Sequence, residues 1–356
     1  MIHFWVRSEY RDDEFRTPLT PLGAKKLLDN GIKVTIEESH KRTFSIDEYR
    51  SVGCEIANKG SWINTDLDTI ILGLKELDDE IILEHRHIMF AHIYKNQKGS
   101  KHILNNFRKN NGILYDLEYL KDANSKRVAA FGYYAGFSGA FVGLDIWLSF
   151  KENNLETDIE IPVNTSKNIL VRSASKKVDI YKNTGNQIPK IIVIGAGGRV
   201  GSGACDFFKS LGLKITEWDI KETSSRNSFS EILEHDIFVN CVLSDNNTVK
   251  FLKKSDITDK RKLSLISDVS CDPGSDFNTI PLYDEPSSFK KPYQFINRGK
   301  NPLLLTAIDN LPAMLPKESS INFEKQLLPY LLDFNVDKNG VWGRAEKVFY
   351  DNINII

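Results

Sequence analysis

The chain has 356 residues, of which 41% are hydrophobic, so it is long enough to form two domains, each with its own core. Its 47 Lys and Arg residues nearly balance its 48 Asp and Glu residues, and the formal net charge is −1. Such a chain has no overall field to attract nucleic acid or an anionic membrane, and we expect neither partner.

Cysteine use and the N-terminal residues predict the compartment. Cys54, Cys205, Cys241 and Cys271 are widely spaced and form no CxxC pair, which argues against a disulfide framework and against a structural zinc site. Residues 1–15 carry acidic side chains where a signal peptide would have a basic and then an apolar region. We therefore expect a cytoplasmic protein.

Strand-like and helix-like stretches alternate through the first 130 residues. In chain order they are IHFWVR, PLGAKKLLDNG, KVTIEE, IDEYRSVG, TIILGL, HIMFAHIY, HILNNFRKNNG and ILYDLEYL. This alternation is typical of an open sheet of parallel strands covered by helices, and it predicts an α/β domain.

Polar residues stand at the ends of three predicted strands. Lys75 and Glu76 follow TIILGL, His92 lies in or after HIMFAHIY, and Glu118 lies in ILYDLEYL. An amine, an imidazole and carboxylates brought together in this way can tune one another's pKa for proton transfer near neutral pH. The alternative is a solvated surface lysine and a hydrogen-bonded core histidine.

The histidines of LEHRHIMFAH raise a second alternative, a metal site. His85 and His87 share one face of a strand, but His92 faces the other way by alternation. No helical carboxylate–histidine motif accompanies them, and we expect no metal.

Residues 129–150, AAFGYYAGFSGAFVGLDIWLSF, form a nearly continuous apolar run. Small residues recur within it as they do in packed membrane helices, but Asp145 and several glycines interrupt it and no basic clusters flank it. We expect a buried helix that crosses between two domains, with glycines that allow another backbone to approach closely.

The run KIIVIGAGGRVGSGA, residues 190–204, indicates a dinucleotide-binding unit, because a β-branched strand leads through clustered glycines into a helix. Gly195, Gly197, Gly198 and Gly201 would let the backbone approach a pyrophosphate, and the helix that begins near Arg199 would direct its N–H groups toward it. Asp219 ends the next strand, where a carboxylate meets the adenosine ribose. The alternative is a glycine-rich turn with no ligand.

The dinucleotide unit continues through DIFVNCV, KLSLISDVS and LLLTAID, and the pattern becomes helical after Leu311. We expect two Rossmann-like domains with parallel sheets flanked by helices. A substrate domain of residues 1–130 plus 318–356 would be interrupted by an NAD-binding domain of residues 131–317. The active site is expected in the cleft between them.

Short segments spread along nearly the whole chain carry a family resemblance. They are FRTPLTP (15–21), FSIDEYRSVG (44–53), GSWI (60–63), IILGLKEL (70–77), FAHIYK (90–95), LYDLEYL (114–120), RVAAFGYYAGFSGA (127–140), WDIKET (218–223) and IDNLPAMLPKES (308–319). Together they resemble the NAD-dependent, L-lysine-forming saccharopine dehydrogenases, a family grouped with alanine dehydrogenase and the transhydrogenase nucleotide domain.

The resemblance implies a monomeric enzyme that uses NAD to cleave saccharopine reversibly into L-lysine and 2-oxoglutarate. Lys75 matches the lysine that takes the proton of the secondary amine, and His92 matches the histidine that serves imine hydrolysis. Glu76 and Glu118 match the acids that tune these two groups. Further matches are Arg16 and Arg127, suited to the substrate carboxylates, and Asp309, suited to the lysine amine.

Two segments depart from the family pattern, residues 243–251 and residues 283–301. Because these loops could lie near the nicotinamide and the substrate, one alternative is an opine-type dehydrogenase that acts on a related amino acid–2-oxo acid conjugate. A non-catalytic NAD-binding regulator is the other alternative, although sensing a nucleotide does not require the predicted set of proton-transfer groups.

Overall fold

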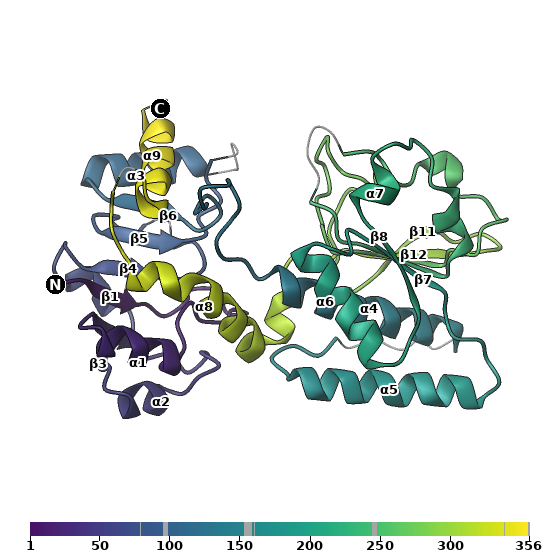
Figure 1. The fold of residues 1–356 in the computed structure, drawn as a ribbon, viewed down its shortest axis with the longest axis horizontal. Coiled ribbons are helices and arrows are strands. Elements are labelled where there is room, and N and C mark those ends of the chain that lie inside the picture. Colours follow the sequence, from purple (N-terminus) through teal and green to yellow (C-terminus); the bar gives the residue numbers. More distant parts are fainter. Residues whose placement is uncertain are drawn as a thin grey trace. The chain divides into compact units, whose positions relative to one another are not determined.

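A computed structural model describes residues 1–78, 80–94, 99–152, 159, 161–243, 248–337 and 339–354. The chain divides into two compact units (Figure 1). Unit 1 comprises Met1–Phe131 and Pro316–Ile356, and unit 2 comprises Gly132–Leu315. In Figure 1 the purple N-terminal strands and the yellow C-terminal helices lie in the same unit.

Unit 1 is built on a six-stranded sheet. Its elements are β1 (His3–Val6), α1 (Pro21–Asp29), β2 (Lys33–Glu37), α2 (Ile46–Ser51), β3 (Glu55–Ala57), η1 (Ser61–Asn64), β4 (Ile70–Leu72), β5 (Arg86–Met89), α3 (Ser100–Asn110), β6 (Ile113–Asp116), α8 (Pro316–Leu332) and α9 (Val341–Ile353). The strand order is β3-β2-β1-β4-β5-β6, and each pair of neighbours is parallel. All six strands therefore end at the same edge of the sheet.

The inner strands of unit 1 pack against side chains on both faces, as expected for a parallel sheet, whereas the edge strand β3 is partly exposed. Phe4 and Val6 of β1 pack in a core that includes residues of α1 and α8, whereas Trp5 packs on the opposite face with residues of α3 and α9. The helices begin at polar caps. The Thr20 hydroxyl accepts a hydrogen bond from the Gly23 N–H before α1, and Ser45 forms a capping box with Glu48 at α2.

The two C-terminal helices complete unit 1. Trp342 of α9 is 2% exposed, and its indole N–H donates to the carbonyl of Tyr330 in α8 at 3.0 Å. The Tyr115 hydroxyl of β6 donates to Glu346 of α9 at 2.7 Å. Residues more than 200 positions apart in the sequence thus share one core.

Unit 2 also contains a six-stranded sheet. Its elements are α4 (Gly132–Lys151), α5 (Lys167–Asn183), β7 (Ile191–Ile194), α6 (Arg199–Ser210), β8 (Ile215–Trp218), α7 (Ile220–Thr223), η2 (Ser230–Glu234), β9 (Ile237–Asn240), η3 (Lys254–Asp256), β10 (Leu265–Asp268), β11 (Gln294–Asn297), β12 (Leu303–Thr306) and η4 (Leu311–Met314). The order is β11-β12-β10-β9-β7-β8, and only β11 runs antiparallel to its neighbour among the paired strands described.

The apolar run of residues 129–150 passes from unit 1 into unit 2, and from Gly132 onward it forms α4, which lies in unit 2. A Cβ on Gly136 would lie 1.8 Å from the carbonyl oxygen of Val200 in α6, so its glycines allow the close approach that we expected. Asp145 is buried and accepts a hydrogen bond from Lys177 of α5 at 2.5 Å, which explains an acid in this helix. No helix in the described residues has the length and apolarity that crossing a membrane requires.

The predicted fold class, α/β with two Rossmann-like sheets flanked by helices, is confirmed. The sequence analysis named neither α5 nor β11. The segment 283–301, interpreted above as a loop, contains β11, which pairs with β12 at the edge of the sheet. Residues 244–247, within the other divergent segment, lie outside the described residues.

Candidate active site

The carboxyl edge of the unit 1 sheet gathers most of the predicted catalytic side chains. Strands β1, β4, β5 and β6 are adjacent in the sheet, and the chain after each of them carries charged residues. Lys75 and Glu76 follow β4, His92 follows β5, and Glu118 follows β6. Lys95, the last residue of the FAHIYK segment, lies outside the described residues.

His92 contacts one of the predicted acids directly. Its Nδ1 lies 3.5 Å from an oxygen of Glu118, and its side chain is 48% exposed. The other Glu118 oxygen lies 3.3 Å from the guanidinium of Arg127, whose Nε also donates to the Glu118 carbonyl at 3.2 Å. His92 adopts a φ of 53°, which is uncommon for a residue with a side chain and turns the chain sharply after β5. The structure thus brings together three predicted residues, an imidazole, a carboxylate and a guanidinium.

A second carboxyl group, Asp116, lies beneath this cluster and was not predicted. It is 1% exposed, and one of its oxygens accepts the Glu118 backbone N–H at 2.9 Å. The pKa of Asp116 is raised to about 6, mainly by burial and in addition by the charge of Glu118, while hydrogen bonds from backbone N–H groups and the charge of His92 oppose the rise. Its place at the end of β6, two residues before Glu118, was the available signal in the sequence.

Lys75 lies among carboxylates. Burial raises the pKa of Glu14, but the charge and hydrogen bonds of Arg16 and the charge of Lys75 outweigh burial and leave that pKa below its ordinary value. Burial likewise raises the pKa of Glu76, but hydrogen bonds and the charges of Arg11 and Lys75 lower it overall. Lys75 is therefore close enough to both carboxylates to stabilise their ionised forms.

Arg16 is buried and held by Glu14. Its Nε and Nη2 donate to the two Glu14 oxygens at 2.7 and 2.5 Å, and its guanidinium carbon lies 4.3 Å from the centre of the Phe131 ring. This two-pronged ion pair and the ring fix the plane of the guanidinium. Sequence reasoning missed Glu14, although a carboxylate two residues before a candidate substrate-binding arginine was a usable signal.

Glu76 forms an ion pair that the sequence analysis did not anticipate. Its carboxylate accepts hydrogen bonds from Arg11, including one from Nε at 2.7 Å, and both side chains are partly exposed. Arg11 lies in the segment after β1, which carries acidic and basic residues in alternation. Glu76 is thus paired with Arg11 as well as placed near Lys75.

The glycine turn of unit 2 has the geometry that a pyrophosphate requires. Gly195 has a φ of 84°, and a Cβ on Gly201 would lie 2.0 Å from the Gly195 carbonyl oxygen. Helix α6 begins at Arg199 after Gly198, which provides no side-chain cap. Gly197 and Gly198 are exposed at the turn. The bare backbone and the helix N-terminus fit the diphosphate of a dinucleotide.

Asp219 lies beside this turn, directly after β8. Its carboxylate accepts the Gly197 N–H at 2.7 Å and the Ile220 N–H at 2.8 Å. A Cβ on Gly197 would lie 2.4 Å from that carboxylate, so only glycine fits here without displacing it. The structure therefore brings the predicted ribose-binding acid to the predicted phosphate-binding turn.

Asp309 follows β12 at the carboxyl edge of the unit 2 sheet and is exposed. Burial raises the pKa of Cys271 to about 12, and the charge of Asp309 adds to the rise, so the two side chains are neighbours. At the same edge, buried Asp268 accepts hydrogen bonds from Asn240 at 2.9 Å and Tyr283 at 2.8 Å. Asp309 belongs to unit 2, whereas Lys75 and His92 belong to unit 1.

His85 and His87 are buried among aromatic rings rather than arranged around an ion. The His87 ring lies edge-on to Trp62 and Phe107, with centroid separations of 5.3 and 5.6 Å. Within the described ranges, no three His, Cys, Asp or Glu side chains are grouped so that they could hold a metal.

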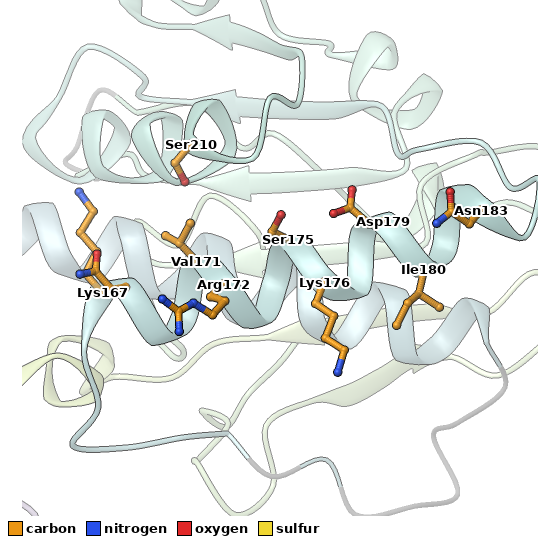
Figure 2. Close-up of a pocket in the computed structure, with 10 residues that line it drawn as sticks. Lys167, Val171, Arg172, Ser175, Lys176, Asp179, Ile180, Asn183 and Ser210 are labelled. Atoms are coloured by element: carbon orange, nitrogen blue, oxygen red, sulfur yellow. The ribbon is translucent and has the colours of Figure 1, made fainter.

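An open pocket of unit 2 runs along α5. Figure 2 shows its lining, which comes from α5 and from Ser210 of α6. The lining residues are Lys167, Asn168, Val171, Arg172, Ser175, Lys176, Asp179, Ile180, Asn183 and Ser210. None of them belongs to the glycine turn or to the predicted site, and the pocket is a surface groove beside a helix.

Comparison with known proteins identifies relatives over nearly the full length. The chain is 41% identical to saccharopine dehydrogenase [NAD(+), L-lysine-forming] of Schizosaccharomyces pombe, over 98% of this chain and 97% of that protein. It is 42% identical to the protein of the same name from Candida albicans, over 97% of this chain and 95% of that protein. The alanine dehydrogenase/PNT N-terminal domain family matches residues 5–138.

Solved structures share the fold at low identity. An L-alanine dehydrogenase superposes with a TM-score of 0.63 at 15% identity, covering 99% of this chain and 94% of the other. A transhydrogenase from Sinorhizobium meliloti gives a TM-score of 0.64 at 14% identity, covering 97% of each chain. The full-length sequence identity is the decisive finding, and the chain belongs to the family of NAD+-dependent, L-lysine-forming saccharopine dehydrogenases.

Proposed function

We propose that this enzyme catalyses the reversible reaction of saccharopine, NAD+ and water to L-lysine, 2-oxoglutarate, NADH and a proton. The observation that carries the proposal is the 41% identity to the Schizosaccharomyces pombe enzyme over 98% of this chain. The clustering of an amine, an imidazole and carboxylates at one sheet edge supports it, because the reaction requires proton transfers at a secondary amine and at an imine.

The glycine turn and Asp219 are the proposed NAD site. The N–H groups at the N-terminus of α6 would hold the pyrophosphate, the Gly197–Gly198 turn would let it approach the backbone closely, and Asp219 would accept hydrogen bonds from the adenosine ribose. When bound, NAD+ supplies the acceptor for the hydride from the glutaryl α-carbon of saccharopine. The protein's part is to hold that carbon and to move the protons.

Lys75 is the proposed base for the redox half of the reaction. Oxidation of the secondary amine releases a proton, and a neutral amine on Lys75 can accept it. Lys75 lies close enough to Glu14 and Glu76 for its charge to lower the pKa of both carboxyl groups. Each of these carboxylates is also paired with an arginine, Glu14 with Arg16 and Glu76 with Arg11.

His92 is the proposed acid–base group for imine hydrolysis. Water adds to the imine carbon, and the resulting carbinolamine collapses to L-lysine and 2-oxoglutarate. One group must take a proton from water and return it to the leaving amine. The contact of His92 with Glu118 orients the imidazole for this exchange, and the exposure of the ring allows water to reach it.

Arg16 and Arg127 are the proposed partners of substrate carboxylates. The pairing of Arg16 with Glu14 and that of Arg127 with Glu118 fix both guanidinium groups in place near the proposed catalytic pair. Asp309, which follows β12 of unit 2, is the proposed partner of the lysine amine.

The test is an NADH oxidation assay with 2-oxoglutarate and a panel of amines that includes L-lysine, L-ornithine and L-alanine. We expect L-lysine to give the highest kcat/KM, and saccharopine to reduce NAD+ in the reverse direction. Faster turnover with another amine would indicate an opine-type dehydrogenase. Tight NADH binding without turnover of any amine would indicate a regulator.

We also propose that the enzyme acts as a monomer in the cytoplasm. The four cysteines, three of them buried and all unpaired, suit a reducing compartment. Light scattering of the purified protein measures the mass in solution, and a mass near 40.5 kDa is expected. Fluorescence microscopy of the tagged protein checks the compartment.

A further inference from the structure

Two side chains that the proposed mechanism does not use, Arg7 and Glu9, surround the peptide of Lys75. We propose that they are positioning residues that fix the backbone carrying the catalytic amine. The inference rests on the role proposed for Lys75. It requires only contacts within unit 1, where all of these residues lie.

Glu9 holds the chain after β4 through its carboxylate. One oxygen accepts the Leu74 N–H at 2.8 Å, and the other accepts the Lys75 N–H at 3.1 Å. Glu9 is 8% exposed, so these bonds are largely shielded from water. A single carboxylate thus fixes two consecutive peptide groups, of which the second belongs to Lys75.

Arg7 holds the next peptide group along the chain, which begins at the carbonyl of Lys75. Its Nη2 donates to the carbonyl oxygen of Lys75, and its Nη1 lies 3.2 Å from Glu9. Arg7 is 1% exposed, and a Cβ on Gly73 would lie 2.5 Å from its guanidinium carbon. The guanidinium therefore lies directly against the chain at Gly73, where only glycine leaves it room.

The arrangement also connects Lys75 to the strand that precedes His92. The Leu74 carbonyl accepts the Phe90 N–H at 2.9 Å, and Phe90 is two residues before His92. The Leu74 N–H thus donates to Glu9, and the Leu74 carbonyl accepts from Phe90. Fixing Leu74 and Lys75 therefore fixes the two proposed catalytic segments relative to each other.

Position matters here because a proton is transferred efficiently only over hydrogen-bonding distance, and a displacement of about 1 Å can lower a rate about a hundredfold. A lysine has a long side chain, so the protein restricts its amine first by fixing its backbone. The Arg7–Glu9 pair does this with opposite charges that neutralise each other.

The test begins with Glu9→Gln, which keeps the size of the side chain but replaces one accepting oxygen by an amide donor facing a backbone N–H. We expect kcat for saccharopine oxidation to fall about tenfold to a hundredfold. The Kd for NADH should stay within about twofold, because the glycine turn is not altered. Turnover within about twofold of wild type would overturn the inference.

A double-mutant cycle separates positioning from general damage. In a Lys75→Met background, Glu9→Gln should lower the residual turnover by less than about twofold, because Glu9 acts through Lys75. If Glu9→Gln lowers the turnover of Lys75→Met by the same factor as that of wild type, Glu9 does not act through Lys75 and the inference is wrong.

Glu324→Gln is the matched control. Glu324 is also a buried carboxylate of unit 1, and it accepts the Thr20 N–H rather than a bond from the Lys75 segment. We expect this variant to lose stability without a fall in kcat. An equal loss of kcat in both variants would assign the effect to lost stability and overturn the inference.

A second variant and a second measurement keep the test independent of folding defects and of the substrate. Arg7→Lys keeps the charge but replaces the two nitrogens that reach Glu9 and the Lys75 carbonyl by one. It should lower kcat and leave the Kd for NADH unchanged, as Glu9→Gln does. Hydrogen exchange of the wild-type and variant proteins should be about tenfold faster at residues 74 and 75 in the variants. Unchanged hydrogen exchange at residues 74 and 75 would show that Arg7 and Glu9 do not fix this backbone segment. A wild-type enzyme inactive on saccharopine would refute the proposed function alone.

Discussion

The proposed site residues of unit 1 each stand beside a carboxylate. His92 has Glu118, Lys75 has Glu14 and Glu76, and Arg16 has Glu14. Such contacts hold side chains in place, so replacing a single member alters the geometry of its partner.

Replacing either proposed proton-transfer group should lower turnover while leaving nucleotide binding intact. General acid–base groups contribute about a hundredfold to ten-thousandfold, so Lys75→Met and His92→Gln should each lower kcat by that order. His92→Gln should in addition allow the imine to accumulate, since its step follows hydride transfer. Steady-state rates and NADH fluorescence titrations measure these effects.

The matched controls are Lys109→Met and His102→Gln on the exposed surface of α3 in the same unit. Both should keep wild-type turnover. Near-normal turnover of Lys75→Met or His92→Gln would remove that residue from the mechanism and leave it as a surface lysine or a structural histidine.

Asp219 should determine the preference for NAD over NADP. Its carboxylate lies beside Gly197, and it would repel a 2′-phosphate at the adenosine ribose. Asp219→Asn removes that charge and should raise the ratio of kcat/KM for NADP to that for NAD about tenfold, equivalent to about 1.4 kcal/mol. Equal efficiency of the wild-type enzyme with both nucleotides would contradict the assignment.

At the scale of elements, the contact between α4 and α6 depends on residues without side chains. Gly136 faces the Val200 carbonyl, and a Cβ on Gly203 would lie 1.9 Å from the Tyr133 carbonyl oxygen. The two helix backbones therefore approach each other more closely than side chains would allow. Helix α6 also begins at the glycine turn, so this contact supports the proposed NAD site.

Gly136→Ala should destabilise unit 2 by about 1–3 kcal/mol, because the added methyl group forces α4 away from α6. Denaturant unfolding monitored by tryptophan fluorescence measures the loss. Ser173→Ala, on the exposed surface of α5, is the control and should leave stability unchanged. Equal stability of Gly136→Ala and wild type would show that the helices can separate at no cost.

At the scale of the whole molecule, stability should fall in acid because of His87. Burial lowers its pKa well below 6.5, and the charges of Arg7 and His85 add to that effect. Below about pH 6.5 the unfolded chain binds a proton that the folded chain does not, so the free energy of unfolding declines with decreasing pH. The limiting slope for one such group is about 1.4 kcal/mol per pH unit.

Asp116 changes the pH dependence of the free energy of unfolding in the opposite direction. Its folded pKa of about 6 lies above the ordinary value of 3.8, so between these values the folded state holds a proton that the unfolded state has lost. Its contribution to stability is therefore greatest below about pH 4 and disappears as the pH rises through about 6. Asp116→Asn should remove this contribution, so the free energy of unfolding should fall more steeply as the pH decreases.

The measurement is the free energy of unfolding between about pH 5 and pH 8. His87→Phe should flatten the decline below about pH 6.5, because the titrating group is gone. His102→Phe, on the exposed surface of α3, should leave the pH dependence as in wild type. An unchanged decline in His87→Phe would show that other groups cause it.

Much of the fold and of the proposed nucleotide site was predictable from local sequence. Residues 190–204 predict a tight turn between a strand and a helix, because their glycines stand between a β-branched strand and a helical segment. A Cβ on Gly201 would lie 2.0 Å from the Gly195 carbonyl oxygen, so this turn requires glycine. Likewise, alternating strand-like and helix-like segments predict parallel sheets, since parallel strands need a crossover between them. The family resemblance followed from motifs in order along the chain.

The tertiary structure alone decided which charges meet. Arg11 pairs with Glu76, 65 positions away, and local spacing did not specify this pair, because such contacts depend on how loops fold back over strand ends. The hydrogen bond from the Lys75 N–H to the Glu9 carboxylate joins residues 66 positions apart. Segments with weak periodicity, such as β11, form strands only because a neighbouring strand offers hydrogen-bonding partners. Local propensity and spacing thus predicted the elements and the glycine turn, whereas packing between distant segments determined the surroundings of each proposed catalytic group.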